Sequence, residues 1–236
     1  MNKLIIALCL GVASLLPNVA VAQDKPTIGV IEFKNESGAG WWSGGVGWEL
    51  AGMLSNELAA TNAFRIVERS KLESVLAEQN LAASGRVSAA SGAQMGKLTG
   101  AQYLVAGTVT AYEEGAKSTG GGLSVRGISL GGNSSEAYLA VDIRVINSTT
   151  GEIDFVRTIE GRAKSGGMSI GISRGDFGGA LGQQNKTPAG KAIRAALVEI
   201  TDYLECAMVR QGGCMAEYDA KEQKRRDSSR GALDLD

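Results

Sequence analysis

The sequence predicts an α+β fold, in which a layered α/β domain carries two β-hairpins and ends in a C-terminal helix. Short apolar runs alternate with helical patterns over residues 27–112, as expected for a layered α/β core. Residues 113–186 are rich in glycine and serine and place apolar side chains at every second position. Residues 187–209 return to the spacing of an amphipathic helix.

Residues 1–22 have the form of a secretory signal peptide. Lys3 precedes the apolar run Leu4–Leu16, and Ala20–Ala22 forms a small-residue cleavage site before Gln23. The run is too short for a membrane-spanning helix. Cys9 lies inside it, too early for lipoprotein processing, so we expect export without a lipoprotein anchor.

The first part of the α/β domain is assigned to residues 23–112. A capping box is expected to open its second helix, with a serine at the cap and a glutamate three residues later. The expected elements are strands at Thr27–Phe33, Phe64–Glu68 and Gln102–Tyr112, and helices at Trp48–Leu58, from Ser70–Glu73 onward, and at Ala93–Leu98.

The predicted hairpins occupy residues 113–146 and 147–186. Within Glu136–Ile146 apolar and polar residues alternate without a break over about eleven positions, close to the length of a tilted strand that crosses a bilayer. The lipid-facing candidates are Leu139, Val141, Ile143 and Val145, and the lumen-facing candidates are Asp142, Arg144, Glu160 and Arg162. An ordinary half-buried antiparallel strand is the alternative.

Other parts of the two hairpins show the same alternation. It recurs in Leu123–Leu130 and Met168–Ile172, while Ile153, Phe155 and Arg157 share one face of the intervening strand. Because arginine is costly at the centre of a bilayer, Arg157 must lie near an interface or be paired. Four strands cannot close a barrel, so a membrane form requires neighbouring subunits.

The C-terminal region is divided into residues 187–214, a helix that packs on the α/β domain, and residues 215–236, a charged tail. Thr187 and Pro188 suit the cap and first turn of the helix. Cys206 and Cys214 can form a disulfide in an oxidising compartment, or remain separate thiols. The tail is expected to be disordered and solvated.

Composition excludes several classes of function. The chain contains no histidine and has a net charge of −1, which removes histidine-based catalysis and metal sites and gives no electrostatic basis for nucleic-acid binding. Paired catalytic carboxylates are not evident, so we expect no enzyme and no cofactor. A strand, a Gly-x-Gly and a helix loosely match a dinucleotide fingerprint, but Ser43 replaces the third glycine and two tryptophans crowd the loop.

The order of several motifs resembles the curli-secretion channel family (CsgG/HfaB). The matching pieces are Ile28–Phe33 with Asn35–Gly38, Ala51–Leu58, Phe64–Arg69 with Leu72 and Leu76–Glu78, Leu98–Tyr103 before Gly107–Tyr112, and Val141–Ile153. They cover nearly all of the mature chain. The resemblance implies a periplasmic α/β domain in a homo-oligomeric ring, ninefold in that family, whose hairpins build one shared outer-membrane barrel. It implies an ungated pore, in contact with outer-membrane lipid and without catalysis, that exports unfolded fibre or adhesin subunits, with accessory factors as further partners.

The resemblance also points to a pore constriction in the loop after the first strand. In the family this loop carries an inward-pointing aromatic residue, and Trp41 and Trp42 are the candidates here. The alternative is that these side chains pack on a neighbouring helix or subunit. The best-known members of the family are lipoproteins, whereas this chain lacks the required cysteine. A second function therefore stays open: a soluble periplasmic accessory protein of the same fold that binds an envelope or cell-wall assembly partner.

Overall fold

The computed structural model describes residues 24–118, 124–125, 128–129, 133–164 and 187–232. The predicted signal peptide and the predicted strand at Met168–Ile172 lie outside this range. No helix among the described residues is long and apolar enough to cross a membrane.

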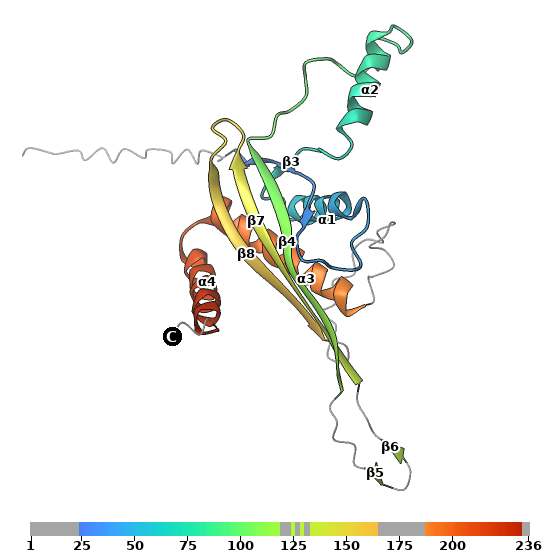
Figure 1. Cartoon of the computed structure of the whole chain (residues 1–236). Coiled ribbons are helices and arrows are strands. Elements are labelled where there is room, and N and C mark those ends of the chain that lie inside the picture. Colours follow the sequence, from blue (N-terminus) through green and yellow to red (C-terminus); the bar gives the residue numbers. More distant parts are fainter. Residues whose placement is uncertain (1–23, 119–123, 126–127, 130–132, 165–186, 233–236) are drawn as a thin grey trace, which may run out of the picture.

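One six-stranded sheet forms the centre of the domain (Figure 1). Its main path runs β3 (Arg65–Ile66), β1 (Thr27–Val30), β4 (Tyr103–Ser118), β7 (Asn133–Asn147) and β8 (Ile153–Lys164), with β2 (Lys34–Asn35) also paired to β4. The N-terminal strands are parallel to their neighbours, whereas β4, β7 and β8 form an antiparallel meander. The predicted α+β class is therefore confirmed for the described residues.

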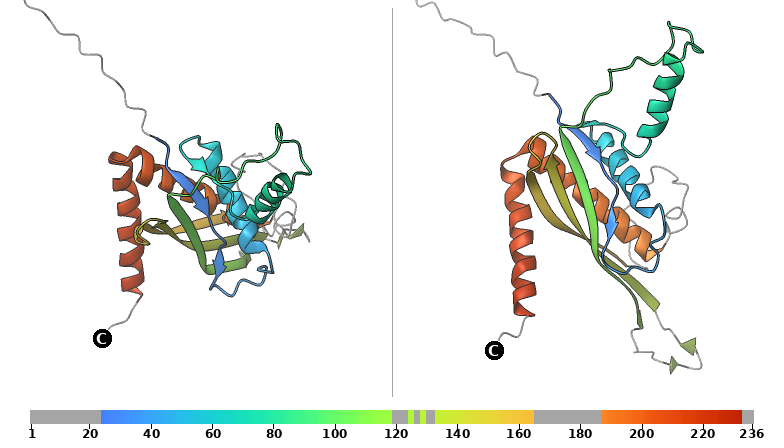
Figure 2. Two further views of the ribbon diagram at one scale, coloured as in Figure 1. Left: turned by 90° about the horizontal axis from the view of Figure 1, so that it is seen from above. Right: turned by 45° about the horizontal axis from the view of Figure 1, so that its top comes forward.

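Helices α1 (Val46–Ala60) and α3 (Pro188–Glu205) cover one face of this sheet (Figures 1 and 2). The start of α3 is capped as predicted, because the Thr187 hydroxyl accepts a hydrogen bond from the backbone N–H of Gly190 at 3.1 Å. The core lies between the two helices and the sheet, with Leu54, Ile143 and Ile200 fully buried in it.

The apolar row of β7 belongs to this core, and the prediction that it faces lipid is wrong. Leu139, Val141, Ile143 and Val145 are each at most 2% exposed beneath the helices. A glycine in the neighbouring strand lets α3 approach this closely, since a Cβ atom at Gly161 would collide with the Ala192 carbonyl oxygen. The half-buried antiparallel strand that was the alternative describes β7 correctly.

The strands β4 and β7 continue beyond the helices as a two-stranded arm (Figure 1). Their antiparallel register runs from Tyr103 opposite Asn147 to Ser118 opposite Asn133, and a β-bulge between Val109 and Ala111 interrupts it. Within the predicted first hairpin, residues 113–118 of β4 pair with residues 133–138 of β7, and most of β7 and β8 also belongs to the domain sheet. The hairpin boundaries at residues 113–146 and 147–186 stay a prediction. Within the first hairpin, β5 (Ser124–Val125) pairs antiparallel with β6 (Ile128–Ser129).

The charged tail is helical, contrary to the prediction of disorder. A short π-helix (Cys206–Arg210) follows α3, and α4 (Gly213–Gly231) follows in turn. A disulfide joins Cys206 to Cys214 across this junction, which confirms the predicted pairing. All views in Figures 1 and 2 place α4 at the β8 side of the molecule.

The helix α2 (Leu72–Ala83) stands away from the domain on the β3 side (Figure 1). The predicted capping box does not form, because the Ser70 hydroxyl donates to the Glu68 carboxylate at 2.7 Å and Lys71 occupies the cap position. The helix predicted at Ala93–Leu98 is likewise absent, and a left-handed backbone at Gly96 (φ 72°) is incompatible with a helix there.

Candidate functional site

The beginning of the loop between β2 and α1 is held by hydrogen bonds. The Asn35 side-chain oxygen accepts from the backbone N–H of Ser37 at 3.0 Å and from its hydroxyl at 2.7 Å. The Glu36 N–H donates to the Val109 carbonyl at 2.8 Å, which ties the loop to β4. Such an Asx turn lets a short loop hold a fixed shape without secondary structure.

Both candidate constriction residues lie in this loop and are half-buried. The Trp41 ring is 5.5 Å from the Trp42 ring and 5.5 Å from the Tyr112 ring of β4, which it meets edge-on. Both tryptophans pack against the core cluster. The Trp41 indole Nε1–H is buried and has no hydrogen-bond partner. Within one subunit the arrangement therefore matches the packing alternative, and an inward-pointing ring stays a prediction.

The loop between β2 and α1 carries Trp41 and Trp42 and is called the aromatic loop below. A cavity of about 610 Å³ lies beside it. Its lining comes from residues 31–36, from the loop and from α1, and consists of Ile31, Glu32, Phe33, Lys34, Asn35, Glu36, Trp42 and Trp48. The glycine near the start of α1 is explained by packing, because a Cβ atom at Gly47 would collide with the Phe33 carbonyl oxygen. Gly47 thus permits close helix–strand contact at this point.

Tyr112 connects the aromatic loop to the two-stranded arm. Its hydroxyl donates to the Glu114 carboxylate at 2.6 Å. Burial, together with this hydrogen bond and the carboxylate charge, raises the pKa of Tyr112. The ring therefore stays a neutral donor on the side where the arm leaves the domain.

The four lumen-facing candidates share the face of the sheet opposite the helices. Across β7 and β8 the register places Asp142 opposite Thr158, and Arg144 opposite Val156. Glu160 and Arg162 follow along the same face of β8. The sequence therefore grouped these residues correctly, while their contact with a water-filled pore remains a prediction.

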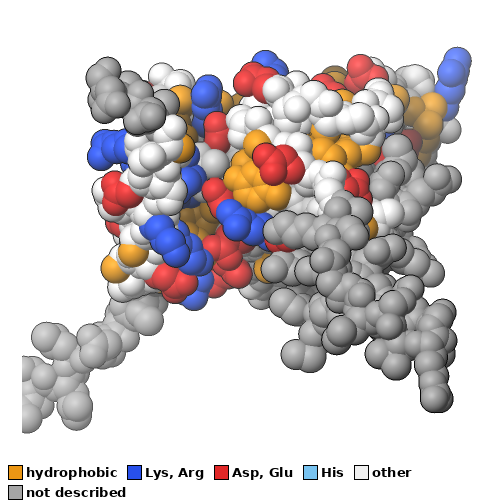
Figure 3. All heavy atoms as spheres, turned by 60° about the horizontal axis from the view of Figure 1, so that its bottom comes forward, with side chains coloured by type: hydrophobic (Ala, Val, Ile, Leu, Met, Phe, Trp, Pro, Cys, Tyr) orange, Lys and Arg blue, Asp and Glu red, His pale blue; other side chains and the backbone are white. Residues whose placement is uncertain are grey.

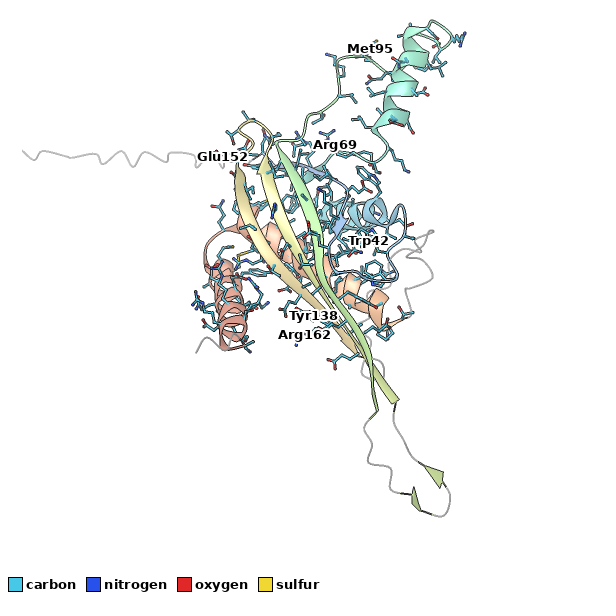
Figure 4. The ribbon with its side chains drawn as sticks, viewed as in Figure 1. Trp42, Arg69, Met95, Tyr138, Glu152 and Arg162 are labelled. Atoms are coloured by element: carbon cyan, nitrogen blue, oxygen red, sulfur yellow. A yellow bond between two sulfur atoms is a disulfide. The ribbon has the colours of Figure 1, made fainter. Side chains whose placement is uncertain are left out.

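Three of these polar residues make side-chain contacts, and Tyr138 and Arg162 lie close to the base of the arm (Figure 4). The Thr158 hydroxyl donates to Asp142 at 2.7 Å, and Arg162 pairs with Glu160 at 3.0 Å. The Arg162 guanidinium lies 5.0 Å from the Tyr138 ring centroid. Burial and the nearby Glu160 charge raise the pKa of Tyr138. Figure 3, viewed towards this end of the molecule, shows side chains of both charges gathered there.

Arg157 projects from the helix-covered face of β8. Its guanidinium is paired, as the sequence analysis allowed for an arginine that shares a strand face with apolar residues. Its guanidinium donates to the Tyr218 carbonyl at 3.0 Å, forms an ion pair with Asp219 at 2.9 Å and lies 5.0 Å from the Tyr203 ring centroid. The Arg157 side chain is only 10% exposed. Two partners come from α4, so the sequence analysis missed them by treating that segment as disordered.

Further contacts fix α4 to the domain. Lys221 donates to Glu199 of α3 at 2.8 Å, and the Tyr218 ring lies 5.3 Å from that of Tyr203. Two arginines hydrogen-bond to Glu222 and lower its pKa to about 2. The clearest sequence signal for this docking was the apolar Tyr218 between charged residues close after Cys214.

Metal chemistry finds no support in the described part of the chain, where acidic and cysteine side chains form no group of three or more that could hold an ion. The geometry offers instead an aromatic loop, a polar sheet face and a protruding two-stranded arm.

Comparison with protein families gives one match that spans almost the whole sequence. The model of the family described as "Curli production assembly/transport component CsgG" matches residues 13–232. Among curated proteins, none is significantly similar to this chain.

Several solved structures share parts of the fold at low sequence identity. The hypothetical protein CT253 from Chlamydia trachomatis is 13% identical, with 77% of this chain and 96% of that chain covered and a TM-score of 0.46. Lipoprotein GNA1162 from Neisseria meningitidis is 17% identical, with coverages of 62% and 89% and a TM-score of 0.34. The PelC dodecamer from Paraburkholderia phytofirmans is 13% identical, with coverages of 74% and 85% and a TM-score of 0.35.

Proposed function

This chain belongs to the CsgG family of curli production assembly/transport components, and from that premise we propose that it is an oligomeric outer-membrane secretion channel. In this proposal the α/β domain lies in the periplasm and each subunit lends two hairpins to a shared barrel. The cargo is an unfolded fibre or adhesin subunit that diffuses through the pore, without catalysis.

The observation that carries this proposal is the common exit point of the two glycine-rich segments. The first segment, residues 119–132, connects Ser118 and Asn133, which pair at the end of the arm. The second, residues 165–186, follows Lys164, which pairs with Glu136 on the same arm. Both segments therefore leave the sheet at one end, as required for two hairpins that enter one membrane.

A ring of subunits is part of the proposal for a physical reason. In lipid, every backbone N–H and C=O group needs a hydrogen-bond partner, and an open sheet edge leaves them unsatisfied at a cost of several kcal/mol each. The two hairpins of one chain cannot close a barrel that is wide enough for an unfolded polypeptide to pass. Neighbouring copies would supply the missing strands.

In this proposal the polar face of the sheet lines the channel and the aromatic loop forms its constriction. Asp142, Arg144, Glu160 and Arg162 would face the aqueous passage below the membrane. Trp41 and Trp42 would narrow it and exclude folded cargo. Their packing against β4 supports a rigid constriction, because the rings would be held by the domain and not by the loop alone.

Deleting the second glycine-rich segment tests the channel. Full-length protein should enter the outer-membrane fraction, resist carbonate extraction, and conduct ions in planar bilayers. Replacing residues 166–185 by a short Gly/Ser linker should abolish conductance while the far-ultraviolet circular dichroism of the domain persists. Equal conductance from both proteins, or no conductance from the full-length protein, would contradict the proposal.

A soluble periplasmic accessory protein is the second candidate, and one observation favours it. The strand face that suggested lipid contact is buried under α3, so the described residues form a closed domain that needs no membrane. Such a protein would bind an envelope or cell-wall assembly partner. Release of the full-length protein with the soluble periplasm would support this function over the channel.

A further inference from the structure

The helix α2 and the loop after it make few contacts with their own domain. Of the twelve residues of α2, only Gln79 is buried. Figure 1 and the right panel of Figure 2 show the helix apart from the sheet, and Figure 4 places Met95 of the following loop at its far end. The described residues thus include one element without a core of its own.

A helix of this length needs an external support. Isolated helices of about 12–15 residues are only marginally stable in water. The support within the subunit is small: the Gln79 side chain donates to the Gln94 carbonyl at 3.4 Å, and Gly92 lies against Ala82. Additional burial must come from another surface if α2 is to stay folded.

The exposed side of this element is apolar. Val75, Leu76 and Leu81 are 36%, 42% and 39% exposed on α2. Met95 and Leu98 of the loop are 62% and 48% exposed. Together they are five of the eight large apolar side chains that remain exposed in the described part of the chain. Clusters of this kind mark interaction surfaces.

The opposite flank of the molecule carries a matching surface. Ile153 and Val156 of β8 are 51% and 61% exposed, and they are the large apolar side chains that β8 exposes on this flank. On the same side of the molecule, residues 221–230 of α4 include five basic and two acidic residues. The charged residues of α2 are Glu73 and Glu78, both acidic. The two flanks are therefore complementary in charge as well as in apolar character.

We propose that α2 of one subunit docks on the β8–α4 surface of the next subunit. This inference rests on the proposed function, because it names the contact that joins neighbouring copies in the ring. Since the two surfaces differ and lie on opposite flanks, the contact is head-to-tail, and repetition of such a contact closes a ring or continues as a filament. The partner is a second copy of this chain, because each chain carries both the α2 surface and the β8–α4 surface.

Acidic substitutions on α2 test the apolar half of the contact. The full-length V75D/L76D protein should run as a monomer in mild detergent under conditions in which the unchanged protein runs as a ring. Both side chains are exposed in the subunit, so its circular dichroism should show no loss of the sheet. N56D on the exposed side of α1 adds a charge elsewhere and should leave assembly unchanged. A ring formed by V75D/L76D would overturn the inference.

Charge reversal tests the direction of the contact. E73K/E78K and K224E/R230E should each raise the concentration of half-assembly by at least about tenfold, because like charges then meet. Mixing the two variants should restore association into dimers and short oligomers of alternating copies, since each then offers an opposite charge to the other. Failure of the mixture to assemble would contradict head-to-tail docking, as would assembly of either variant alone at the normal concentration.

These results separate the inference from the channel proposal. If the unchanged protein forms rings and conducts ions while the α2 variants still assemble, only the docking assignment is wrong. If the unchanged protein never assembles, the ring and its contact are both wrong.

Discussion

The two C-terminal helices are held to the same sheet in different ways. Ten of the residues of α3 are buried, and its apolar stripe lies on the core. In α4 only Tyr218 is buried, and the helix depends on a disulfide, the Arg157 ion pair and the Lys221–Glu199 contact. The first helix is thus stabilised by area removed from water, and the second by a few specific links.

Truncation of the α3 core should have the largest effect. Ile200 and Leu204 are fully buried, so I200A should lower the free energy of unfolding by about 2–5 kcal/mol through lost transfer energy and a residual cavity. Urea unfolding followed by circular dichroism measures this. The same truncation at exposed Ile153 should stay within about 0.5 kcal/mol, and an equal loss at both sites would contradict the packing.

Loss of the disulfide should have the next largest effect, confined to α4. For a loop of this size, the cross-link contributes about 2–3 kcal/mol by restricting the unfolded chain. The C206S/C214S protein should therefore exchange α4 amide hydrogens much faster, while α3 amides remain protected. Equal protection of α4 in both proteins would show that the side-chain links suffice.

Removing the counter-ion of Arg157 should cost less. D219N leaves a mostly buried guanidinium without its ion pair, although the Tyr218 carbonyl and the Tyr203 ring remain. Because Asp219 itself is largely exposed, we expect about 1–2 kcal/mol, below the range for fully buried pairs. D227N, which alters an exposed acid of the same helix, is the control, and equal effects would exclude a specific role for Arg157.

Acid should weaken α4 slightly and selectively. The pKa of Glu222 is lowered from 4.5 to about 2 by its arginine partners, so its stabilising contribution is complete above pH 4.5 and is lost as pH falls towards 2. Thermal melting of E222Q and the unchanged protein should differ near neutral pH and converge near pH 2. A constant difference across this range would rule out Glu222 as the titrating group.

The contrast between the helices also explains which features the sequence could predict. Periodicity identified α3 and grouped Asp142 with Arg144, because helix and strand periods fix which side chains share a face. Periodicity could not decide what covers the other face of β7, since lipid and a packed helix select the same apolar residues. The helix α4 was missed because its contacts are tertiary: Asp219 has no partner until Arg157 is placed beside it.

The aromatic loop likewise shows that the sequence could select residues without predicting their contacts. Sequence resemblance selected Trp41 and Trp42, yet their contact with Tyr112 depends on how β4 runs past the loop. The α2 surface could be recognised as apolar from its sequence, but only the three-dimensional arrangement shows that it lacks a partner within its own subunit.

The β-bulge in β4 has a consequence for variation in this chain. Val109 lies opposite Val141, but Ala111 lies opposite Ala140, so the bulge supplies one extra residue and shifts the alternation beyond it by one position. Tyr112 reaches Trp41 only through this shift. Deletion of Thr110 would remove the extra residue and leave Ala111 opposite Ala140 and Tyr112 opposite Leu139, so the arm should keep the side chains of each face and lose only the local bend of β4.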